Sequence, residues 1–346
     1  MPGKNNNIHI LDCTLRDGGY VNDWRFGADG VKNIAGLLSY SQVDIIELGF
    51  LRNEKFQNDR AVFNSAKGIV PDKLRNNKNA QSAVMVEATV NPFPLELLED
   101  HDSDSVDIIR AMVWKRLLKE GFDYCKALVD KGYKVCIQPV RFDQYSDDEF
   151  IETIKLFNTI HPVAFYVVDS FGDNYTKAIL HYLKLADTYL NPGIALGFHG
   201  HNNLLQVYGA AEAFIECGFK RDIIIDSSVY GMGRGAGNLN TELIVKYLNE
   251  NHNKKYKIEP LIEIYEKYLK PVYDASLWGW GYSVPFYLTA LHRANSLYGG
   301  YYSDELGLDT LEINEILQTV SEPDKIQIIK ENADRYVAEY KAKKRR

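Results

Sequence analysis

The sequence of 346 residues has few cysteines, and none of them lies close to another. The four are Cys13, Cys125, Cys136 and Cys217, and no two have the short spacing of a thiolate metal site. A disulfide framework is not expected either, because such frameworks belong to small, cysteine-rich secreted chains. We therefore expect four reduced thiols, most of them buried.

Long hydrophobic runs and an excess of positive charge are also missing. No run approaches the roughly 18 apolar residues that a membrane-spanning helix needs, and residues 1–7 contain no apolar stretch of the signal-peptide type. The net charge of −7 argues against a nucleic-acid surface. With 45% hydrophobic and 25% charged residues, the composition is that of a globular protein. We expect a cytoplasmic protein with no nucleic-acid or membrane partner.

What the sequence does contain is a repeated alternation of short apolar runs and helical segments. Runs rich in β-branched residues predict eight strands, at Ile8–Cys13, Val43–Leu48, Ala83–Val90, Val106–Val113, Lys134–Val140, Val163–Val168, Ile194–Phe198 and Asp222–Asp226. Helices are predicted between them at Gly30–Tyr40, Trp114–Lys131, Asp147–Ile160, Asn174–Tyr189 and Leu204–Cys217. Gly132 and Gly218 follow two of these helices, as C-terminal caps do. This α/β pattern predicts a closed (β/α)8 TIM barrel, with a doubly wound open sheet as the alternative.

The pattern changes after the eighth strand. We expect residues 1–254 to form the barrel and residues 255–346 to form a helical C-terminal region. Its aromatic stretch at 277–287 suits a lid over the barrel mouth, a homodimer interface, or the core of a small helical domain. From Pro323 to Ala342, apolar and charged residues alternate at helical spacing, which predicts one amphipathic helix.

The segment Gly197–Asn203 carries two histidines at the end of the seventh strand. Residues i and i+2 of a strand point to the same face, so His199 and His201 reach one point from one side. Two imidazoles are good ligands for a divalent ion but leave its coordination incomplete, so a carboxylate is needed from elsewhere. The alternative is that both are simply polar residues at a strand end.

In a (β/α)8 barrel the active site lies at the C-terminal ends of the strands. Acids, arginines and small polar residues gather at these predicted ends, and they are Asp12, Arg16, Asp17, Glu47, Glu87, Arg110, Asp169, Ser170 and Asp226. Asp17 is the best third ligand for an ion held by the two histidines. The open coordination positions would accept a 2-oxo acid such as pyruvate, whose carbonyl the ion would polarise as a Lewis acid. Arg16 would then face the developing enolate charge, unless it forms only a structural salt bridge.

A glycine-rich loop, Gly231–Asn238, follows the eighth strand. Four glycines in seven residues predict a flexible loop with exposed amides, suited to a phosphate, a carboxylate or a mobile lid. It is not a Walker A loop, because no Gly-Lys-Ser/Thr follows.

Three motifs in order, Thr14–Gly18, His199–Asn203 and Gly231–Asn238, resemble the DRE-TIM metallolyase superfamily, which includes HMG-CoA lyase, 2-isopropylmalate synthase and 4-hydroxy-2-oxovalerate aldolase. The resemblance spans roughly residues 8–250 and implies Mn2+ or Mg2+ bound by Asp17, His199 and His201, with Asn238 approaching the metal. It also implies that Glu47 and Asp169 line the site, and that Arg16 stabilises the enolate.

Within that superfamily the chain looks most similar to 4-hydroxy-2-oxovalerate aldolase, on the segments Val168–Ser170, Asp226–Gly233 and Gly281–Tyr287. The last segment implies a tyrosine that reaches the site, either Tyr282 as a catalytic residue or Tyr287 as a substrate contact. We also expect Arg110 and Ser170 to bind substrate.

Two positions depart from the family patterns. The aldolase has its acid/base histidine two positions after the Arg-Asp-Gly motif, where this chain has Tyr20, which at neutral pH is a better hydrogen-bond donor than base. In the glycine loop, Arg234 occupies the region where the CoA lyase has a cysteine. We expect Arg234 to bind a carboxylate or phosphate distal to the reacting bond.

These features predict a metal-dependent aldolase or lyase that cleaves or forms a 4-hydroxy-2-oxo acid through a metal-stabilised, pyruvate-type enolate. The substrates would be a 2-oxo acid and an aldehyde. The alternatives are an acyl-CoA lyase or Claisen-type synthase on the same barrel, and a non-catalytic metal-binding scaffold. A homodimer is expected, and a partner dehydrogenase, known for the aldolase branch, is possible but not indicated by any residue.

Overall fold

The computed structural model describes residues 7–276 and 279–344, and its centre is a parallel sheet closed into a barrel. The strands that pair in this sheet are β1 (Ile8–Asp12), β2 (Ile45–Leu51), β3 (Val62–Phe63), β4 (Gln81–Glu87), β5 (Ile108–Val113), β6 (Lys134–Pro139), β7 (Ala164–Asp169), β8 (Ala195–Gly200) and β9 (Ile223–Ser227). Each of the eight predicted strands is present, with ends within three residues of those predicted.

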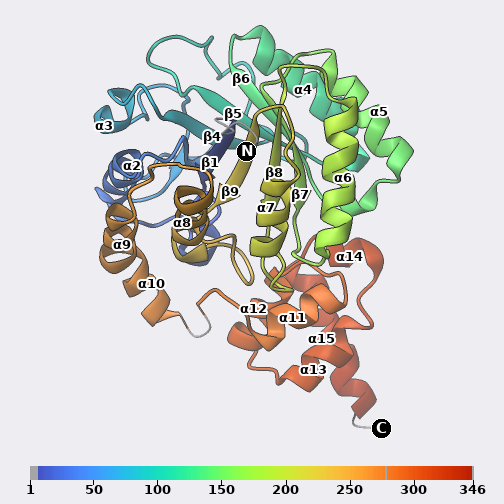
Figure 1. Cartoon of the computed structure of the whole chain (residues 1–346). Helices are drawn as coiled ribbons and strands as arrows, with labels where there is room; N and C mark the ends of the chain where they lie inside the picture. The colour runs from blue at the N-terminus through green and yellow to red at the C-terminus, as the bar shows by residue number, and fades with distance from the viewer. Residues whose placement is uncertain (1–6, 277–278, 345–346) are drawn as a thin grey trace.

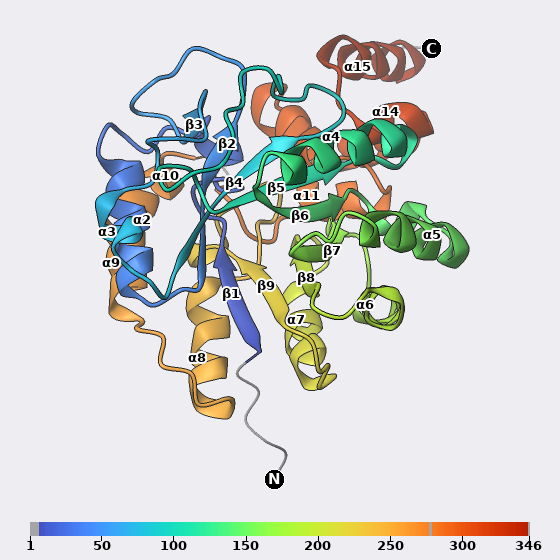
Figure 2. The same ribbon diagram turned by 90° about the horizontal axis from the view of Figure 1, so that it is seen from above.

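The barrel closes at the first strand, because β1 pairs with the strands on both sides of it in the ring. β1 pairs with β2, Leu11 opposite Ile45, and with β9, Ile8 opposite Ile223. Around the ring the order is β1, β2, β4, β5, β6, β7, β8 and β9, while β3 adds only a short edge to β2. Figure 2 shows this ring with helices outside it. The predicted (β/α)8 barrel is confirmed, and the doubly wound alternative is wrong.

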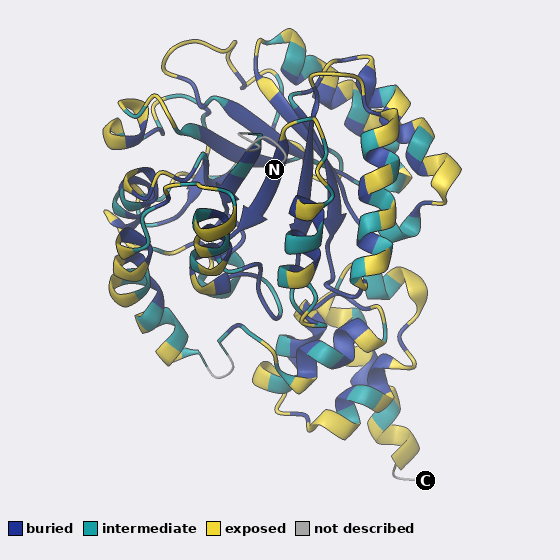
Figure 3. Ribbon diagram, viewed as in Figure 1, coloured by how far each residue is buried: buried dark blue, intermediate teal, exposed yellow. Residues whose placement is uncertain are grey.

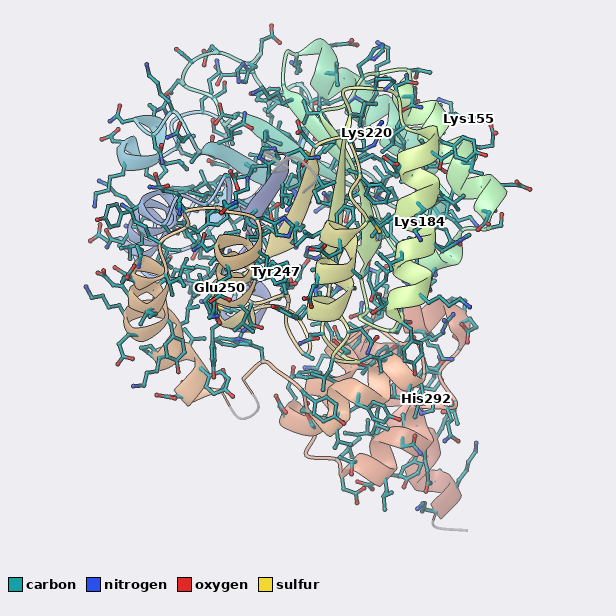
Figure 4. All side chains as sticks on the ribbon, in the orientation of Figure 1. Lys155, Lys184, Lys220, Tyr247, Glu250 and His292 are labelled. Carbon is teal, nitrogen blue, oxygen red and sulfur yellow. The ribbon has the colours of Figure 1, made fainter. Side chains whose placement is uncertain are left out.

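Helices cover the outside of the barrel (Figure 1). They are α2 (Gly30–Tyr40), α3 (Asp72–Arg75), α4 (Leu118–Asp130), α5 (Asp147–Asn158), α6 (Thr176–Tyr189), α7 (Val207–Glu216) and α8 (Thr241–Asn251). The single turn α1 (Gly19–Asn22) instead follows β1 at the barrel mouth. Ser146 begins α5 with a capping box, in which its hydroxyl accepts from the Glu149 amide. Gly132 and Gly218 follow α4 and α7 with φ of 88° and 65°, so both predicted caps are confirmed. In Figure 4, Lys155 on α5 and Lys184 on α6 lie on these outer helices.

The barrel departs from eightfold regularity on one side. The segment between β2 and β4 contains only β3 and the single turn of α3, and residues 88–107 between β4 and β5 form no helix. The segment between β4 and β5 contains Pro92, Pro94 and several aspartates, which favour turns over helix interiors. Residues after β2 and β4, Asn53 and Asn91 among them, line one surface cleft.

The strands are dark in Figure 3 because residues on both of their faces are buried. Inside the barrel lies a small cluster of Leu11, Cys13, Ile45, Ala83, Ile108, Cys136, Ala164, Tyr166, Ala195 and Ile224. A larger cluster joins the outer faces of the strands to the helices. All four cysteines are free thiols, and three are buried, as expected. Within the described ranges, no helix is long and apolar enough to cross a bilayer.

The remaining helices follow the barrel. They are α9 (Glu259–Ile264), α10 (Lys270–Ala275), α11 (Val284–Leu291), α12 (Leu297–Gly300), α13 (Thr310–Leu317), α14 (Glu322–Ile326) and α15 (Lys330–Lys344). Residues of α9 still pack in the large barrel cluster, whereas a separate apolar cluster begins at Leu288 and ends at Val337. Figure 1 shows α11 to α15 together at one end of the barrel.

The single helix predicted from Pro323 to Ala342 is wrong. The chain leaves α14 at Gln327, whose backbone is extended with φ −130° and ψ 119°, and resumes helix at Lys330. This break turns Ile326 and Gln327 toward the barrel mouth, where both line a cavity. A tertiary contact has overridden the helical periodicity.

Candidate active site

The turn after β1 places two charged side chains inside the protein. The Arg16 and Asp17 amides both donate to the Cys13 carbonyl, at 3.0 and 2.8 Å, which curls the chain tightly at the strand end. Arg16 and Asp17 are only 4% and 1% exposed. One guanidinium nitrogen of Arg16, Nη1, lies 2.5 Å from Asp17 Oδ1, so the two form a buried ion pair.

The two histidines of β8 lie on one face, and each is oriented through its Nδ1. His199 Nδ1 lies 3.0 Å from Asp226 Oδ2, and His201 Nδ1 lies 3.2 Å from the Asp169 carbonyl oxygen. Because both partners are acceptors, both Nδ1 atoms carry the proton. Nε2 is therefore the atom of each ring that is left to face a metal ion, as in metal-ligating histidines whose other nitrogen donates a hydrogen bond.

Asp17, His199 and His201 form a cluster whose ligand atoms all lie within 4.8 Å of one another. His201 Nε2 is 3.1 Å from Asp17 Oδ2. Asn238 lies across a backbone bridge from His201, and its amide donates to the Met232 carbonyl at 3.1 Å. Its Oδ1 is buried and has no partner within the described residues. Two imidazoles, a carboxylate and an unpaired amide oxygen fit a divalent ion.

The charges around the cluster favour the ligand forms of its residues. Burial alone would raise the pKa of Asp17, but Arg16 and then His201 outweigh it, and its pKa lies well below the usual range. Burial lowers the pKa of His199 even though Asp226 opposes this. Asp17 is therefore an anion and His199 neutral at neutral pH, which is the state that metal binding needs.

Beneath the cluster runs a buried chain of alternating charges. Glu47 Oε2 accepts from Arg16 Nε at 2.8 Å and from Arg110 Nη1 at 2.7 Å. Arg110 in turn pairs with Asp226, which orients His199. Arg16 and His199 are thus held in place by one connected network.

This placement corrects the expectation for Arg110. It was expected to bind substrate, but its side chain is fully buried and does not line the cavity. Arg110 lies in the middle of β5, so its side chain points into the barrel interior below the rim. Glu47 likewise lies below the site, in contact with Arg16, and does not line the cavity.

Asp169 also lies behind the cavity wall. Burial, and then Asp173, raise the pKa of Asp169 well above its usual range, while hydrogen bonds from Asn174 oppose the shift. Asn174 Nδ2 donates to Asp169 Oδ1 at 2.9 Å. Asp169 thus contacts the cluster of Asp17, His199 and His201 through its backbone carbonyl oxygen, which orients His201.

A cavity of about 190 Å3 opens above the cluster. Among its lining residues are Arg16, Asp17, Tyr20, Met85, Glu87, Val90, Met112, Trp114, Gln138, Val140, Val168, Ser170, Phe171, His199, His201, Arg234, Asn295, Ile326 and Gln327. The wall is mostly apolar away from the charged cluster. Residues from β4, β6 and the C-terminal region are brought together with the three sequence motifs.

Tyr20, Ser170 and Arg234 all line this cavity, as expected for site residues. Arg234 Nη2 donates to the Ser170 carbonyl oxygen at 2.5 Å, and its guanidinium carbon lies 5.6 Å from the centre of the Tyr20 ring. Burial raises the pKa of Tyr20, so its phenol stays protonated and can donate.

The glycine loop is packed rather than exposed, which corrects the expectation of exposed backbone amides. Gly231, Gly233 and Gly237 are buried. A Cβ on Gly237 would lie 2.1 Å from the Gly231 carbonyl oxygen, and one on Gly233 would lie 2.3 Å from Asn238 Nδ2. These glycines allow close backbone approach beside the cluster.

The structure does not bring Tyr282 or Tyr287 to the cavity. Tyr282 is 54% exposed, and Tyr287 packs against the C-terminal apolar cluster. In the predicted aromatic stretch, Leu277 and Trp278 lie outside the described residues. Trp280 is buried and donates to the Tyr230 carbonyl oxygen at 2.7 Å.

Sequence reasoning assigned no role to four polar residues of the wall, which are Glu87, Gln138, Asn295 and Gln327. Glu87 was named only as an acid at the end of a predicted strand. Gln138 lies at a similar position near the end of β6, where a polar residue could have been noticed. Asn295 and Gln327 had none, because no local pattern tells which part of a helical region covers the barrel mouth. The Gln138 Nε2 atom is buried without a partner in the described chain.

Comparison with known proteins agrees with this geometry. A model of the HMGL-like family matches residues 7–266, which is most of the chain. The chain belongs to the HMGL-like family. This HMGL-like chain is 27% identical to oxaloacetate decarboxylase of Mycobacterium tuberculosis over 69% of each chain. It is 25% identical to 4-hydroxy-2-oxovalerate aldolase of Geobacillus genomosp. 3 over 70% of each chain.

A solved structure extends the similarity toward the C-terminal region of this HMGL-like chain. The N-terminal domain of a candidate aldolase from Bacteroides vulgatus superposes with a TM-score of 0.68 at 26% identity, covering 86% of this chain and 98% of that one. Family membership and these relatives indicate a carbon–carbon lyase. Lyases of this family use a divalent metal ion, for which the cluster of Asp17, His199 and His201 is a candidate site.

Proposed function

We propose that this protein is a metal-dependent aldolase that cleaves or forms a 4-hydroxy-2-oxo acid through a pyruvate-type enolate. One observation carries the proposal: Asp17, His199 and His201 share a small cavity with Arg16, whose guanidinium is fixed beside the ligands. A 2-oxo acid chelated there would meet a cation at the atom on which negative charge develops.

Mn2+ or Mg2+, when bound by Asp17, His199, His201 and Asn238, would supply a Lewis acid for the 2-oxo group. Arg16 stabilises the enolate oxygen, because Glu47 and Asp17 hold its guanidinium in one orientation. The Gln138 side chain offers an unpaired N–H to a substrate carboxylate. The apolar wall excludes water and thereby strengthens these charge interactions.

The far end of the substrate would meet Tyr20 and Arg234. Tyr20 donates a hydrogen bond to a substrate oxygen. Arg234 keeps free N–H groups beside its bond to Ser170, since its Nε is buried without a partner in the described chain. We infer that Arg234 holds a distal carboxylate or phosphate. An Arg234→Ala variant whose KM is unchanged for every accepted substrate would contradict this role.

The first test is exchange of the pyruvate methyl protons in D2O, followed by NMR. We expect exchange with Mn2+ or Mg2+, none with EDTA, and none in His199→Ala. Exchange that needs both the ion and His199 would establish enolate formation and leave the aldehyde to be found by a screen. No exchange with any ion would contradict the proposal and favour an acyl-CoA substrate or, failing that, a non-catalytic scaffold.

Decarboxylation of a 3-carboxy-2-oxo acid such as oxaloacetate is a second candidate, favoured by Tyr20. Loss of CO2 forms the same enolate but requires no base on a substrate hydroxyl, so a tyrosine in place of a histidine does not impair it. A relative of this chain is named oxaloacetate decarboxylase. Pyruvate release from oxaloacetate, measured beside cleavage of 4-hydroxy-2-oxovalerate, separates the two.

The assembly of the protein stays a prediction. A homodimer through the C-terminal region, a division of the chain after residue 254 and a cytoplasmic location rest on sequence patterns alone. Size-exclusion chromatography with light scattering would test the dimer.

A further inference from the structure

The proposed aldol cleavage needs a base that removes the proton of the substrate hydroxyl. The side chains that ligate the ion or face the enolate are already engaged, since Asp17, His199 and His201 form the cluster and Arg16 pairs with two acids. Tyr20 is a donor at neutral pH. A different group must accept this proton.

Glu87 is the remaining carboxylate on the cavity wall in the described chain. It ends β4, and its Oε1 accepts from the Thr89 hydroxyl at 2.8 Å, which fixes the orientation of the side chain. Its second oxygen has no protein partner among the described residues. An oriented carboxylate with one free oxygen is a suitable proton acceptor.

The barrel order places Glu87 across the mouth from the histidines. Counting around the ring, β4 is the fourth strand from β8 in either direction, so the two strands are diametrically opposite. A substrate whose 2-oxo acid end lay at the cluster on the β8 side would therefore extend toward the β4 wall. Its hydroxyl carbon, two bonds beyond the 2-oxo carbon, would lie on the side of Glu87.

Glu87 also faces the route into the site. It lines both the cavity and a neighbouring surface cleft of about 450 Å3, together with Tyr20, Val90 and Met112. Arg52 and Asn53 also line this cleft. This carboxylate is thus at the junction where an aldehyde would enter or leave.

We propose that Glu87 is the acid–base residue of the aldehyde half of the reaction, a role that rests on the proposed function. In cleavage, its carboxylate takes the proton of the C4 hydroxyl, and the O–H electron pair forms the aldehyde carbonyl. The C3–C4 bond breaks, and its electrons form the enolate that Arg16 faces. Glu87 passes its proton to water, and a proton from water adds to C3 to complete pyruvate.

The test compares two substrates that give the same enolate. Only one of them has a hydroxyl proton that a base must remove. Pyruvate release is measured from 4-hydroxy-2-oxovalerate and from oxaloacetate, with wild type and Glu87→Gln in Mn2+. We expect cleavage of the hydroxy acid to fall by about 100-fold or more. Decarboxylation of oxaloacetate should stay within about threefold of wild type, which also reports that the variant is folded.

Glu54→Gln is the matched control, because Glu54 lines the same outer cleft but not the cavity. It should leave both activities unchanged. Equal losses on both substrates in Glu87→Gln, or no loss on either, would overturn the role of Glu87. Wild type that exchanges pyruvate protons but cleaves no 4-hydroxy-2-oxo acid would overturn it too. Wild type without exchange would instead overturn the proposed function itself.

Discussion

At the scale of single residues, the cavity wall combines paired charges with the unpaired amide of Gln138. Arg16, Asp17 and His199 each have a fixed partner, whereas the Gln138 Nε2 atom is buried with none in the described chain. An unsatisfied buried donor costs roughly 1–3 kcal/mol. Such a cost is understandable if a substrate oxygen satisfies the donor in the working enzyme.

Gln138→Leu should therefore weaken binding without lowering stability. A hydrogen bond to a charged group contributes about 1.5–3 kcal/mol, so KM for pyruvate should rise by about tenfold or more. The free energy of unfolding should stay the same or rise slightly, because an unpaired polar group is removed. Isotope-exchange kinetics and urea denaturation measure the two quantities. Gln81→Leu, at the other end of the barrel, is the control and should leave KM unchanged.

Asp12 gives a prediction about pH. Burial raises its pKa to about 6, although hydrogen bonds from Thr14 and Thr241 oppose the shift. The folded pKa exceeds the unfolded value near 4, so this group stabilises the fold at low pH, and the contribution is lost as pH rises through about 6. Asp12→Asn removes this dependence. From pH 5 to pH 8, the stability of Asp12→Asn should therefore gain about 1.4 kcal/mol relative to wild type.

Urea denaturation of both proteins at the two pH values tests this. An identical stability difference at pH 5 and pH 8 would mean that Asp12 does not titrate between the folded and unfolded states as described.

At the scale of elements, the loop after β9 determines how closely the backbone approaches the metal cluster. A Cβ on Gly233 would lie 2.3 Å from Asn238 Nδ2 and 2.9 Å from Asp17 Oδ2. Either the loop or the ligands must then move. The loop is thus part of the ligand geometry, and its glycines are required for packing.

Gly233→Ala should lower the affinity for Mn2+ by at least about tenfold, because ligand displacement weakens coordination. Calorimetric titration with Mn2+ measures this directly. Gly209→Ala is the matched control, since a Cβ there meets nothing within 4 Å on the exposed face of α7. It should leave Mn2+ affinity unchanged and stabilise the helix by about 0.5–1 kcal/mol. Equal affinities in the two variants would contradict a role for Gly233 in the site.

At the scale of the whole molecule, the cluster of Asp17, His199 and His201 brings together residues from the beginning and the end of the barrel sequence. Asp17 follows the first strand and His199 comes from the seventh strand around the ring, so an ion bound between them cross-links the fold. Any ligand that binds only the folded state stabilises it by mass action. Metal binding and stability should therefore change together.

Mn2+ at a free concentration of 100 times its Kd should stabilise the protein by about 2.7 kcal/mol. Thermal or urea denaturation with Mn2+ and with EDTA measures the difference, independently of any activity. His199→Ala should lose this increment, whereas His181→Ala on the outer helix α6 should keep it. The same stabilisation in both variants would show that the ion binds elsewhere.

The sequence by itself determined the barrel, because strand periodicity, helix caps and the alternation of the two are local properties of the chain. It also indicated the candidate metal site, because a two-residue spacing on one strand places His199 and His201 together, and the strand ends of a barrel meet at one rim. Only the tertiary structure decided which polar residues face the cavity. Arg110 and Glu47 are buried beneath the site, while Glu87 and Gln138 face the cavity, and Tyr282 lies outside it. Sequence patterns indicate on which face of a helix or strand a residue lies. Its depth along the barrel axis and its contacts with the C-terminal helices depend on how distant segments pack.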